Sequence, residues 1–335
     1  MSRRVIPGLE APDPVLERDV RARLEEVEVA LEKAVQADSG MLAETARYLL
    51  AAGGKRFRPM LVLLSGYFGD PTDPRLIPGA VAIELVHAAT LYHDDVIDEA
   101  ETRHGVPSVN VRWDNTVAIL TGDYLFARAS EISSDLGTDV IALLARTIAT
   151  LCDGQIREVE SSGNIEQTRD AYLEVIRRKT GALIATSCRL GGLLSDAEPE
   201  HVGVLEAYGE ALGVAFQLSD DIMDVTSSAA ELGKEPGVDM REGVYTLPVL
   251  LALHEGAERA ELAALLSAGP PEGERLARAL EIVRDPPTLA EARAAVAAEV
   301  DRARTLAGQL PEGVARVALL QLAEFLAVRC GARRP

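Results

Sequence analysis

Residues 85–98 read LVHAATLYHDDVID, an apolar stretch that ends in three aspartates. The density of apolar residues predicts a buried helix. On such a helix Asp94 and Asp98 share one face because they are four residues apart, and His87 lies on that face two turns earlier. Like charges at this spacing destabilise an exposed helix by about 0.2–0.5 kcal/mol, so the pattern indicates a bound cation. Mg²⁺ is the best match, because it binds one or two carboxylates together with waters and phosphate oxygens.

A second stretch, residues 216–224, reads FQLSDDIMD and repeats the pattern far downstream. Its polar residues follow the i, i+3, i+4, i+7 spacing of one helical face: Gln217, Asp220, Asp221 and Asp224. One Asp-rich helix end is usually a solvated terminus, but two copies with apolar flanks indicate acidic faces turned inward. We therefore expect both clusters to meet at one cavity and to hold metal ions there.

The composition narrows the class of protein. The chain has 335 residues and is 47% hydrophobic, which is enough for a large core, and its length alone allows about one to three domains. Aromatic residues make up only 4%, and Ala and Leu are abundant, which favours helix over sheet. The net charge of −19 argues against nucleic acid and anionic lipid as partners, because their phosphates would be repelled.

Cysteine usage and hydropathy bear on the compartment. Cys152, Cys188 and Cys330 are far apart and have no spacing typical of zinc or of a redox motif, so we expect reduced thiols. The first residues, MSRRVIPG, lack the apolar core of a signal peptide. No apolar run reaches the roughly 20 residues that span a bilayer. These features predict a cytoplasmic protein without a transmembrane segment.

Helical periodicity recurs along most of the chain, and no segment has the alternation of a strand. The spacing predicts helices over 14–38, 41–52, 61–68, 77–99, 115–130, 140–159, 172–194 and 199–225, and again from 246 onward. No linker divides them. We therefore predict an all-α fold, a single large helical bundle over residues 1–335, in which a core of about 41–255 carries the motifs and helices in 256–335 pack on it.

Basic residues accompany the acidic clusters. Residues 53–59 read GGKRFRP, where a glycine pair allows close approach of a ligand and cations follow. Arg103 follows the first cluster, and Lys179 lies in a helix whose apolar continuation turns it inward. Each could be a solvated cation, and His87 could be a core histidine, but a carboxylate–metal site needs an anion, and such cations bind phosphate. The glycine-rich residues 232–243 predict a loop that closes over substrate.

Together these motifs resemble those of the trans-isoprenyl diphosphate synthases, the polyprenyl synthetases. The resemblance extends from about Gly53 to Pro248 and rests on motifs that occur in the family's order. They are residues 53–59 (GGKRFRP), His87, residues 94–98 (DDVID), Arg103, Lys179-Thr180, Phe216-Gln217, residues 220–224 (DDIMD), Gly233-Lys234 and Asp239.

The resemblance implies the isoprenoid synthase type of helical bundle, with a central cavity. It implies a prenyltransferase that condenses isopentenyl diphosphate head to tail with an allylic diphosphate, which binds together with three Mg²⁺ ions. The allylic carbon–oxygen bond ionises, the double bond of isopentenyl diphosphate attacks the cation, and a proton passes to the released diphosphate. Metals and fixed cations would stabilise the leaving group, and a dry cavity would protect the carbocation. Such enzymes are usually homodimers.

The resemblance also implies roles for single residues. The catalytic set is Asp94, Asp95, Asp98, Arg103, Lys179, Asp220 and Asp221. The metal ligands are Asp94, Asp98, Asp220 and Asp224. The allylic diphosphate site is Arg103, Lys179, Thr180, Gln217 and Lys234. The isopentenyl diphosphate site is Lys55, Arg58, His87 and His104.

Three positions depart from the family pattern. His104 stands where a second arginine usually follows Arg103, and it binds isopentenyl diphosphate strongly only when protonated. Glu158 replaces a Gln in the helix after Gly154, and Val244 stands where a Lys commonly follows Glu-Gly. These departures concern the affinity of single sites and leave the reaction class unchanged.

Product length depends on residues before the first cluster. In the family, bulky aromatic residues four and five positions before the first Asp block the growing chain, but Thr90 and Ala89 occupy these positions here. Val86 and Ile83, further up the same helix, also lack rings. The resemblance therefore implies a product longer than C15, a medium or long all-trans polyprenyl diphosphate that would suit a quinone side chain.

Three other functions fit parts of the sequence. A class I terpene cyclase shares the bundle and one Asp-rich motif, but its second motif normally carries Asn, Ser and Glu, and it needs no isopentenyl diphosphate site. A regulatory partner subunit of a heteromeric prenyl synthase would tend to lose motif residues that this chain keeps. A purely structural helical protein would leave two inward acidic clusters unexplained.

Overall fold

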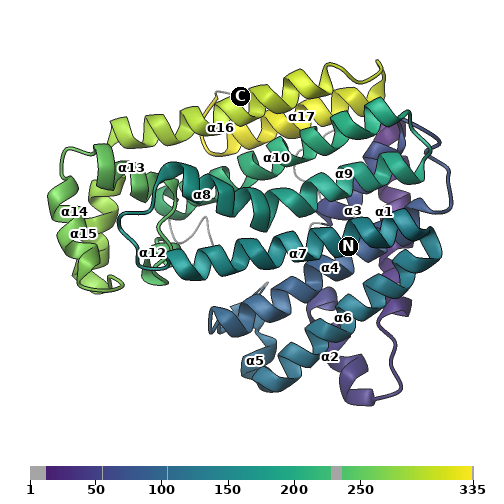
Figure 1. Cartoon of the computed structure of the whole chain (residues 1–335), viewed down its shortest axis with the longest axis horizontal. Helices are drawn as coiled ribbons and strands as arrows, with labels where there is room; N and C mark the ends of the chain where they lie inside the picture. Colours follow the sequence, from purple (N-terminus) through teal and green to yellow (C-terminus); the bar gives the residue numbers. More distant parts are fainter. Residues whose placement is uncertain (1–12, 55, 104, 228–235, 334–335) are drawn as a thin grey trace. The chain divides into compact units, whose positions relative to one another are not determined.

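The computed structural model describes residues 13–54, 56–103, 105–227 and 236–333. The chain is 77% helical, which confirms the all-α class (Figure 1). The described residues form two compact units. The first takes them from Met1–Ala149, Leu183–Gly209 and Leu306–Gln321, and the second from Thr150–Ala182, Glu210–Thr305 and Leu322–Pro335. A single domain over residues 1–335 stays a prediction.

The regular elements follow one another along the chain with short connections. They are α1 (Pro14–Ala34), α2 (Gly40–Ala52), α3 (Phe57–Gly66), α4 (Leu76–Ile97), β1 (Thr102–Arg103), β2 (Val106–Pro107), α5 (Val109–Arg112), α6 (Asn115–Leu136), α7 (Thr138–Ser161), α8 (Arg169–Ile176), the π-helix η1 (Arg177–Gly181), α9 (Ala182–Leu194), α10 (Pro199–Thr226), α12 (Val238–Arg241), α13 (Leu247–Glu255), α14 (Arg259–Ser267), α15 (Gly273–Val283), α16 (Pro286–Ala307) and α17 (Val314–Arg329).

Helix α4 is the core of the first unit, where it packs against α1, α3 and α6. It is apolar on nearly all sides, and its residues from Gly79 to Val86 are buried, as expected of a helix that is covered all round. A side chain at Gly122 of α6 would collide with the His93 ring, because an added Cβ would lie 2.3 Å from Nε2. The glycine therefore leaves room for the His93 ring between α4 and α6.

Helix α4 is also the one helix among the described residues that is long and apolar enough to cross a membrane. In its most apolar window, 67% of the residues are buried inside the protein. Its position in the core therefore accounts for its composition.

Local sequence signals fix several helix starts. The Asp13 carboxylate accepts hydrogen bonds from the backbone N–H of Val15 (2.7 Å) and of Leu16 (3.2 Å), which caps α1 ahead of Pro14. Asp114 caps α6 in the same way, through the N–H of Val117 at 2.8 Å. Helices α1 and α6 begin at Pro14 and Asn115, the starts that the spacing predicts.

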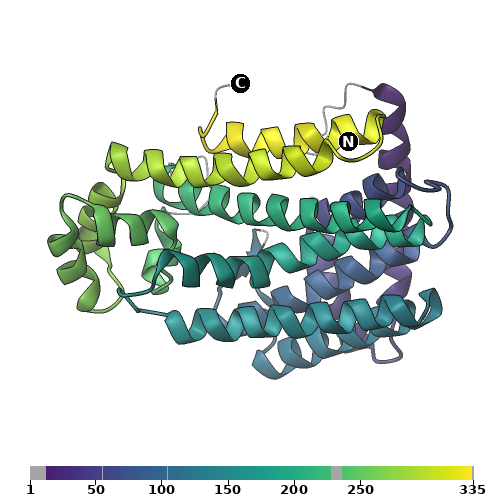
Figure 2. The same cartoon turned by 45° about the horizontal axis from the view of Figure 1, so that its top comes forward.

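In the second unit, α13, α14 and α15 pack together, and they lie at the left of Figures 1 and 2. Residues of α16 and α17 are joined by ion pairs, such as Arg304 Nη1 to Glu324 Oε2 at 2.6 Å.

The three cysteines are unpaired thiols, of which Cys152 is exposed and Cys188 and Cys330 are buried. Burial raises the pKa of the Cys188 thiol to about 12.

Three segments differ from the sequence-based expectation. The segment after the first cluster contains a hairpin, in which Thr102 pairs with Pro107 and Arg103 with Val106; two-residue strands are too short to show alternation. The helix predicted over 172–194 is interrupted by the π-helix η1. The predicted loop 232–243 contains the short helix α12, which begins after Gly237 in a left-handed conformation (φ 78°); its residues 232–235 lie outside the described chain.

Candidate active site

The first carboxylate cluster ends α4. Asp98 is the C-cap residue, and its backbone N–H donates to the Asp94 carbonyl oxygen at 2.8 Å. The Asp98 side chain is exposed and that of Asp94 is half-buried, whereas Asp95 is completely buried. Because Asp94 and Asp98 are one turn apart and accessible, they are the pair able to bind a ligand from solvent.

Asp95 has a different partner. Its Oδ1 accepts a hydrogen bond from Arg103 Nε at 2.7 Å. Arg103 is held from the other side by the β1–β2 hairpin, which turns through Gly105 with φ at 78°. The buried carboxylate therefore orients the Arg103 guanidinium, a group whose η nitrogens can also bind an anion. His104 lies outside the described residues.

The basic loop before α3 contains a structural arginine. Arg56 is only 8% exposed and binds Glu28 of α1 through Nε at 2.7 Å and Glu84 of α4 through Nη1 at 2.8 Å. Burial acts to lower its pKa, but Glu28 and Glu84 outweigh burial, so the pKa of Arg56 is raised. Arg56 thus ties the loop to two helices, a role that the sequence pattern did not distinguish. Lys55 lies outside the described residues.

Arg58 and His87 are both half-buried in the first unit. Arg58 Nε has no hydrogen-bond partner among the described residues. Burial lowers the pKa of the Arg58 guanidinium, while the negative charge of Glu84 opposes that shift. The guanidinium remains charged, since its unperturbed pKa is far above neutrality.

The residues predicted to set product length lie on α4. Ile83, Val86 and Ala89 are fully buried, and Thr90 is half-buried. The Thr90 hydroxyl donates to the His87 carbonyl oxygen at 2.8 Å, so it is satisfied within the helix. All of these side chains are small or aliphatic, as the sequence indicates.

The second cluster ends α10. Asp220 is 39% exposed and forms an ion pair with Arg329 of α17. The Arg329 guanidinium also lies over the Phe216 ring, 5.3 Å from its centroid, and its Nε is 3.1 Å from Met223 Sδ. A carboxylate has enough lone pairs to bind an arginine and a metal together. Arg329 is a site residue that the sequence did not reveal, because the C-terminal helices showed only a packing pattern.

Asp221 is buried and held by hydrogen bonds at both oxygens. Tyr172 donates its hydroxyl to Oδ2, and Gln217 Nε2 donates to Oδ1 at 2.9 Å. The Gln217 side-chain oxygen Oε1 in turn accepts a hydrogen bond from the Thr180 hydroxyl at 2.8 Å, which fixes the orientation of the side-chain amide. Burial, together with the charges of Asp239, Asp224 and Glu158, raises the pKa of Asp221 well above its usual range. Gln217 and Thr180, predicted to bind diphosphate, thus also support this carboxyl group.

Tyr172→Phe tests this support. The change removes one of the two donors to Asp221, so we expect a decrease in kcat/KM of about 10-fold, typical of losing a partner that orients an active-site ligand. Steady-state kinetics at saturating Mg²⁺ measures the effect. Tyr245→Phe is the matched control, because Tyr245 is equally buried in the same unit, and it should remain within about twofold of wild type. Equal losses in both variants would contradict the role of Tyr172.

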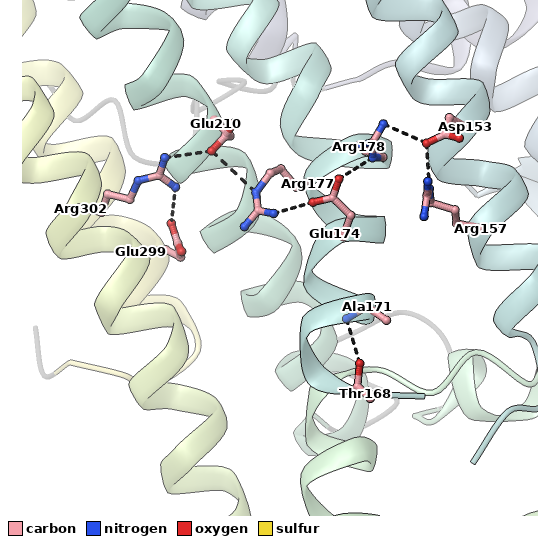
Figure 3. A network of polar contacts seen from close by, with 10 residues as sticks. All are labelled: Asp153, Arg157, Thr168, Ala171, Glu174, Arg177, Arg178, Glu210, Glu299 and Arg302. Atoms are coloured by element: carbon pink, nitrogen blue, oxygen red, sulfur yellow. Dashed lines mark hydrogen bonds and ion pairs between the residues drawn. The ribbon is translucent and has the colours of Figure 1, made fainter. Parts of the chain in front are cut away.

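The π-helix η1 carries Lys179 and Thr180. The ion pairs that Figure 3 shows join its first residues to α8 and α7. Glu174 binds Arg177 Nη1 at 2.7 Å and Arg178 Nε at 2.6 Å, and Arg178 Nη1 reaches Asp153 of α7 at 2.9 Å. Wider turns of this kind are often found at functional sites. Here the turn directs Lys179 to α7 and Thr180 to α10.

Lys179 contacts one of the positions that depart from the family pattern. Its Nζ lies 2.6 Å from Glu158 Oε1 of α7. Asp224, near the end of α10, is buried, and its backbone carbonyl oxygen accepts a hydrogen bond from the N–H of Gly237 at 3.0 Å. Val244 N–H donates to the Asp239 carbonyl oxygen at 2.8 Å. Lys234 lies outside the described residues.

The carboxylates fit Mg²⁺ in type and number. Within the described part of the chain, no group of three or more Asp, Glu, His or Cys side chains is gathered closely enough to hold a metal by itself. Mg²⁺ does not need such a cage, because it keeps waters and takes oxygens from a phosphate substrate. The pairs Asp94 with Asp98 and Asp220 with Asp224 each offer the hard oxygen ligands that it requires.

Comparisons with known proteins identify the family. The sequence profile of the polyprenyl synthetase family matches residues 39–283. A nonaprenyl diphosphate synthase of Mycobacterium tuberculosis is 40% identical over 329 residues, covering 98% of each chain. A heptaprenyl diphosphate synthase component 2 of Geobacillus stearothermophilus is 41% identical over 90% of this chain and 94% of that protein.

Solved structures give the same result. A decaprenyl diphosphate synthase of Rhodobacter capsulatus superposes with a TM-score of 0.87 at 34% identity, covering 94% of this chain and 98% of that one. A geranylgeranyl pyrophosphate synthase of Corynebacterium glutamicum, complexed with calcium and isoprenyl diphosphate, gives a TM-score of 0.85 at 40% identity, covering 96% and 99%. The chain therefore belongs to the polyprenyl synthetase family.

Proposed function

We propose that this protein is a trans-polyprenyl diphosphate synthase, a prenyltransferase that joins isopentenyl diphosphate head to tail to an allylic diphosphate. The similarity to nonaprenyl and heptaprenyl synthases at 40–41% identity carries this proposal and supports a product longer than C15. The cations and carboxylates of the predicted motifs would supply the chemistry that the reaction needs.

In this reaction the chain's own residues bind and orient the diphosphates. Arg103, fixed by Asp95, and Lys179 would contact the allylic diphosphate and stabilise the charge that grows on it as the carbon–oxygen bond breaks. Arg58, with Lys55 and His87, would hold isopentenyl diphosphate with its double bond facing the allylic carbon. Mg²⁺, held by Asp94, Asp98, Asp220 and Asp224, would add positive charge at the leaving group.

The isopentenyl double bond then forms a bond to the allylic carbon, and a proton moves from the new cation to the released diphosphate. The protein must exclude water until that proton is lost, because water would capture the carbocation. That both carboxylate clusters act on one diphosphate, and that three ions bind, stay predictions from the sequence.

We further propose that the active form is a homodimer in the cytoplasm. Unpaired thiols fit a reducing compartment. The second candidate is one subunit of a heteromeric synthase, which is favoured by the relatives named component 2. Light scattering of the purified protein and fractionation of its native cells would test the dimer and the location.

The decisive experiment incubates the purified protein with Mg²⁺, farnesyl diphosphate and isopentenyl diphosphate, and identifies products by mass spectrometry. We expect a polyprenyl diphosphate longer than C15, and no product when EDTA removes the metal. Activity that appears only after a second chain is added would favour the subunit function. Cyclic hydrocarbons formed without isopentenyl diphosphate would indicate a terpene cyclase.

Ala89→Phe tests the assignment of product length. A ring at this position of α4 should block the growing chain, so we expect shorter products, with the main species moved by at least one isoprene unit. Because Ala89 is fully buried, a ring there can strain the core, and thermal unfolding should be measured beside the product assay. Thr90→Phe is the companion variant at a half-buried site. An unchanged product distribution in both folded variants would refute the assignment.

A further inference from the structure

Lys179 and Glu158 form a close ion pair away from bulk solvent. Nζ and Oε1 are 2.6 Å apart, and the side chains are only 27% and 18% exposed. Screening by water is weaker at such a site than on an open surface, so the carboxylate reduces the positive potential that Lys179 offers to any other anion.

The backbone holds this pair together. An added Cβ at Gly154 of α7 would lie 2.7 Å from the Lys179 backbone nitrogen and 2.9 Å from Arg178 Cβ. The glycine therefore lets α7 touch the π-helix. Glu158 follows Gly154 by four residues, so it lies on the same face of α7 and next to Lys179.

The surrounding ion pairs keep the π-helix from moving away. Arg178 binds Glu174 at 2.6 Å and Asp153 at 2.9 Å, and Arg177 binds Glu174 at 2.7 Å (Figure 3). Asp153 and Glu158 belong to the same helix, α7. The contact between Glu158 and Lys179 is thus positioned by the packing at Gly154 and by the neighbouring ion pairs.

We propose that Glu158 is a positioning residue that holds Lys179 toward the allylic diphosphate while weakening its grip, and so speeds release of the finished product. This inference rests on the proposed function. Substrate and product are both allylic diphosphates, and each added isoprene unit buries more apolar surface, which tightens product binding. A counter-charge at Lys179 opposes that gain at the diphosphate end, where release must begin.

Glu158→Gln tests the proposal, because it removes the charge and keeps an oxygen that can accept from Lys179. The probe is farnesyl thiodiphosphate, in which sulfur replaces the bridging oxygen so that ionisation is slow. We expect its Kd, measured by calorimetry with Mg²⁺, to fall about three- to tenfold, the range of a single partly screened charge pair. We also expect steady-state turnover to fall and a rapid first-turnover burst to appear, since release becomes slower.

Glu160→Gln is the matched control. It makes the same chemical change at an exposed carboxylate of the same helix, two residues after Glu158. Its Kd for the probe should stay within about twofold of wild type. An equal decrease in both variants would mean that only net charge matters, and would overturn the proposal.

Other outcomes also decide the matter. An unchanged Kd in Glu158→Gln would refute the role of Glu158. The proposed function would not be affected by that result if the wild-type protein catalyses prenyl transfer. A higher Kd together with a higher Mg²⁺ requirement would make Glu158 a metal ligand and overturn the positioning role as well. The binding measurement needs no turnover, so it judges Glu158 even if the prenyl transfer assay fails.

Discussion

Asp94→Ala and Asp220→Ala are each expected to lower kcat/KM by about 10³-fold. Each change removes a carboxylate proposed to hold Mg²⁺ at the leaving diphosphate, and charge stabilisation of this kind is commonly the largest contribution to catalysis. Steady-state kinetics over a range of Mg²⁺ concentrations measures the loss and the expected increase in metal requirement. Asp123→Ala, which removes a 62% exposed carboxylate of α6, is the control and should keep wild-type activity.

The double variant makes this prediction sharper. Because both aspartates are proposed to act on the same diphosphate, their effects should not multiply, and the double variant should lose little more than either single one. Losses that multiply to about 10⁶-fold would mean that the aspartates act independently. Wild-type kinetics in either single variant would remove that residue from the site.

Arg56→Met should lower the free energy of unfolding more than any other variant that we propose. The change leaves Glu84, which is 6% exposed on the core helix α4, without its closest cation. Breaking a buried ion pair from one side costs about 3–5 kcal/mol in the free energy of unfolding, because the remaining charge is poorly solvated. Urea unfolding followed by circular dichroism measures the loss.

Two further variants separate this effect from a general loss of charge. Arg21→Met removes an arginine from a half-exposed pair with Glu17, and should cost less than about 1 kcal/mol. Adding Glu84→Gln to Arg56→Met should restore part of the stability, since it removes the unpaired charge. If the double variant is as unstable as Arg56→Met, packing and not charge accounts for the loss.

The sequence was most informative where function and periodicity coincide. The all-α class and the helices that carry both clusters follow from apolar spacing, and α1 begins at Pro14 as that spacing predicts. The same spacing separates Asp94 and Asp98 from Asp95, which faces the interior and binds Arg103. A helical face can be read from the sequence because its geometry is local.

Other features depend on contacts between distant segments, and no local pattern reports them. Tyr172 of α8 donates a hydrogen bond to Asp221 of α10, and Arg329 of α17 forms an ion pair with Asp220. Arg56 and Arg58 look alike in sequence, yet the first is used for structure, because Glu28 and Glu84 happen to surround it. The π-helix at Lys179 lies close to Gly154, a residue far from it in the sequence.

The exposed thiol offers a site for a fluorescent label on the native protein. Cys152 is the one exposed cysteine of three, and it lies on α7, six residues before Glu158. A maleimide fluorophore would therefore attach at a single place on the native chain, without engineered substitutions. Its emission would report changes in the surroundings of α7 when substrates bind.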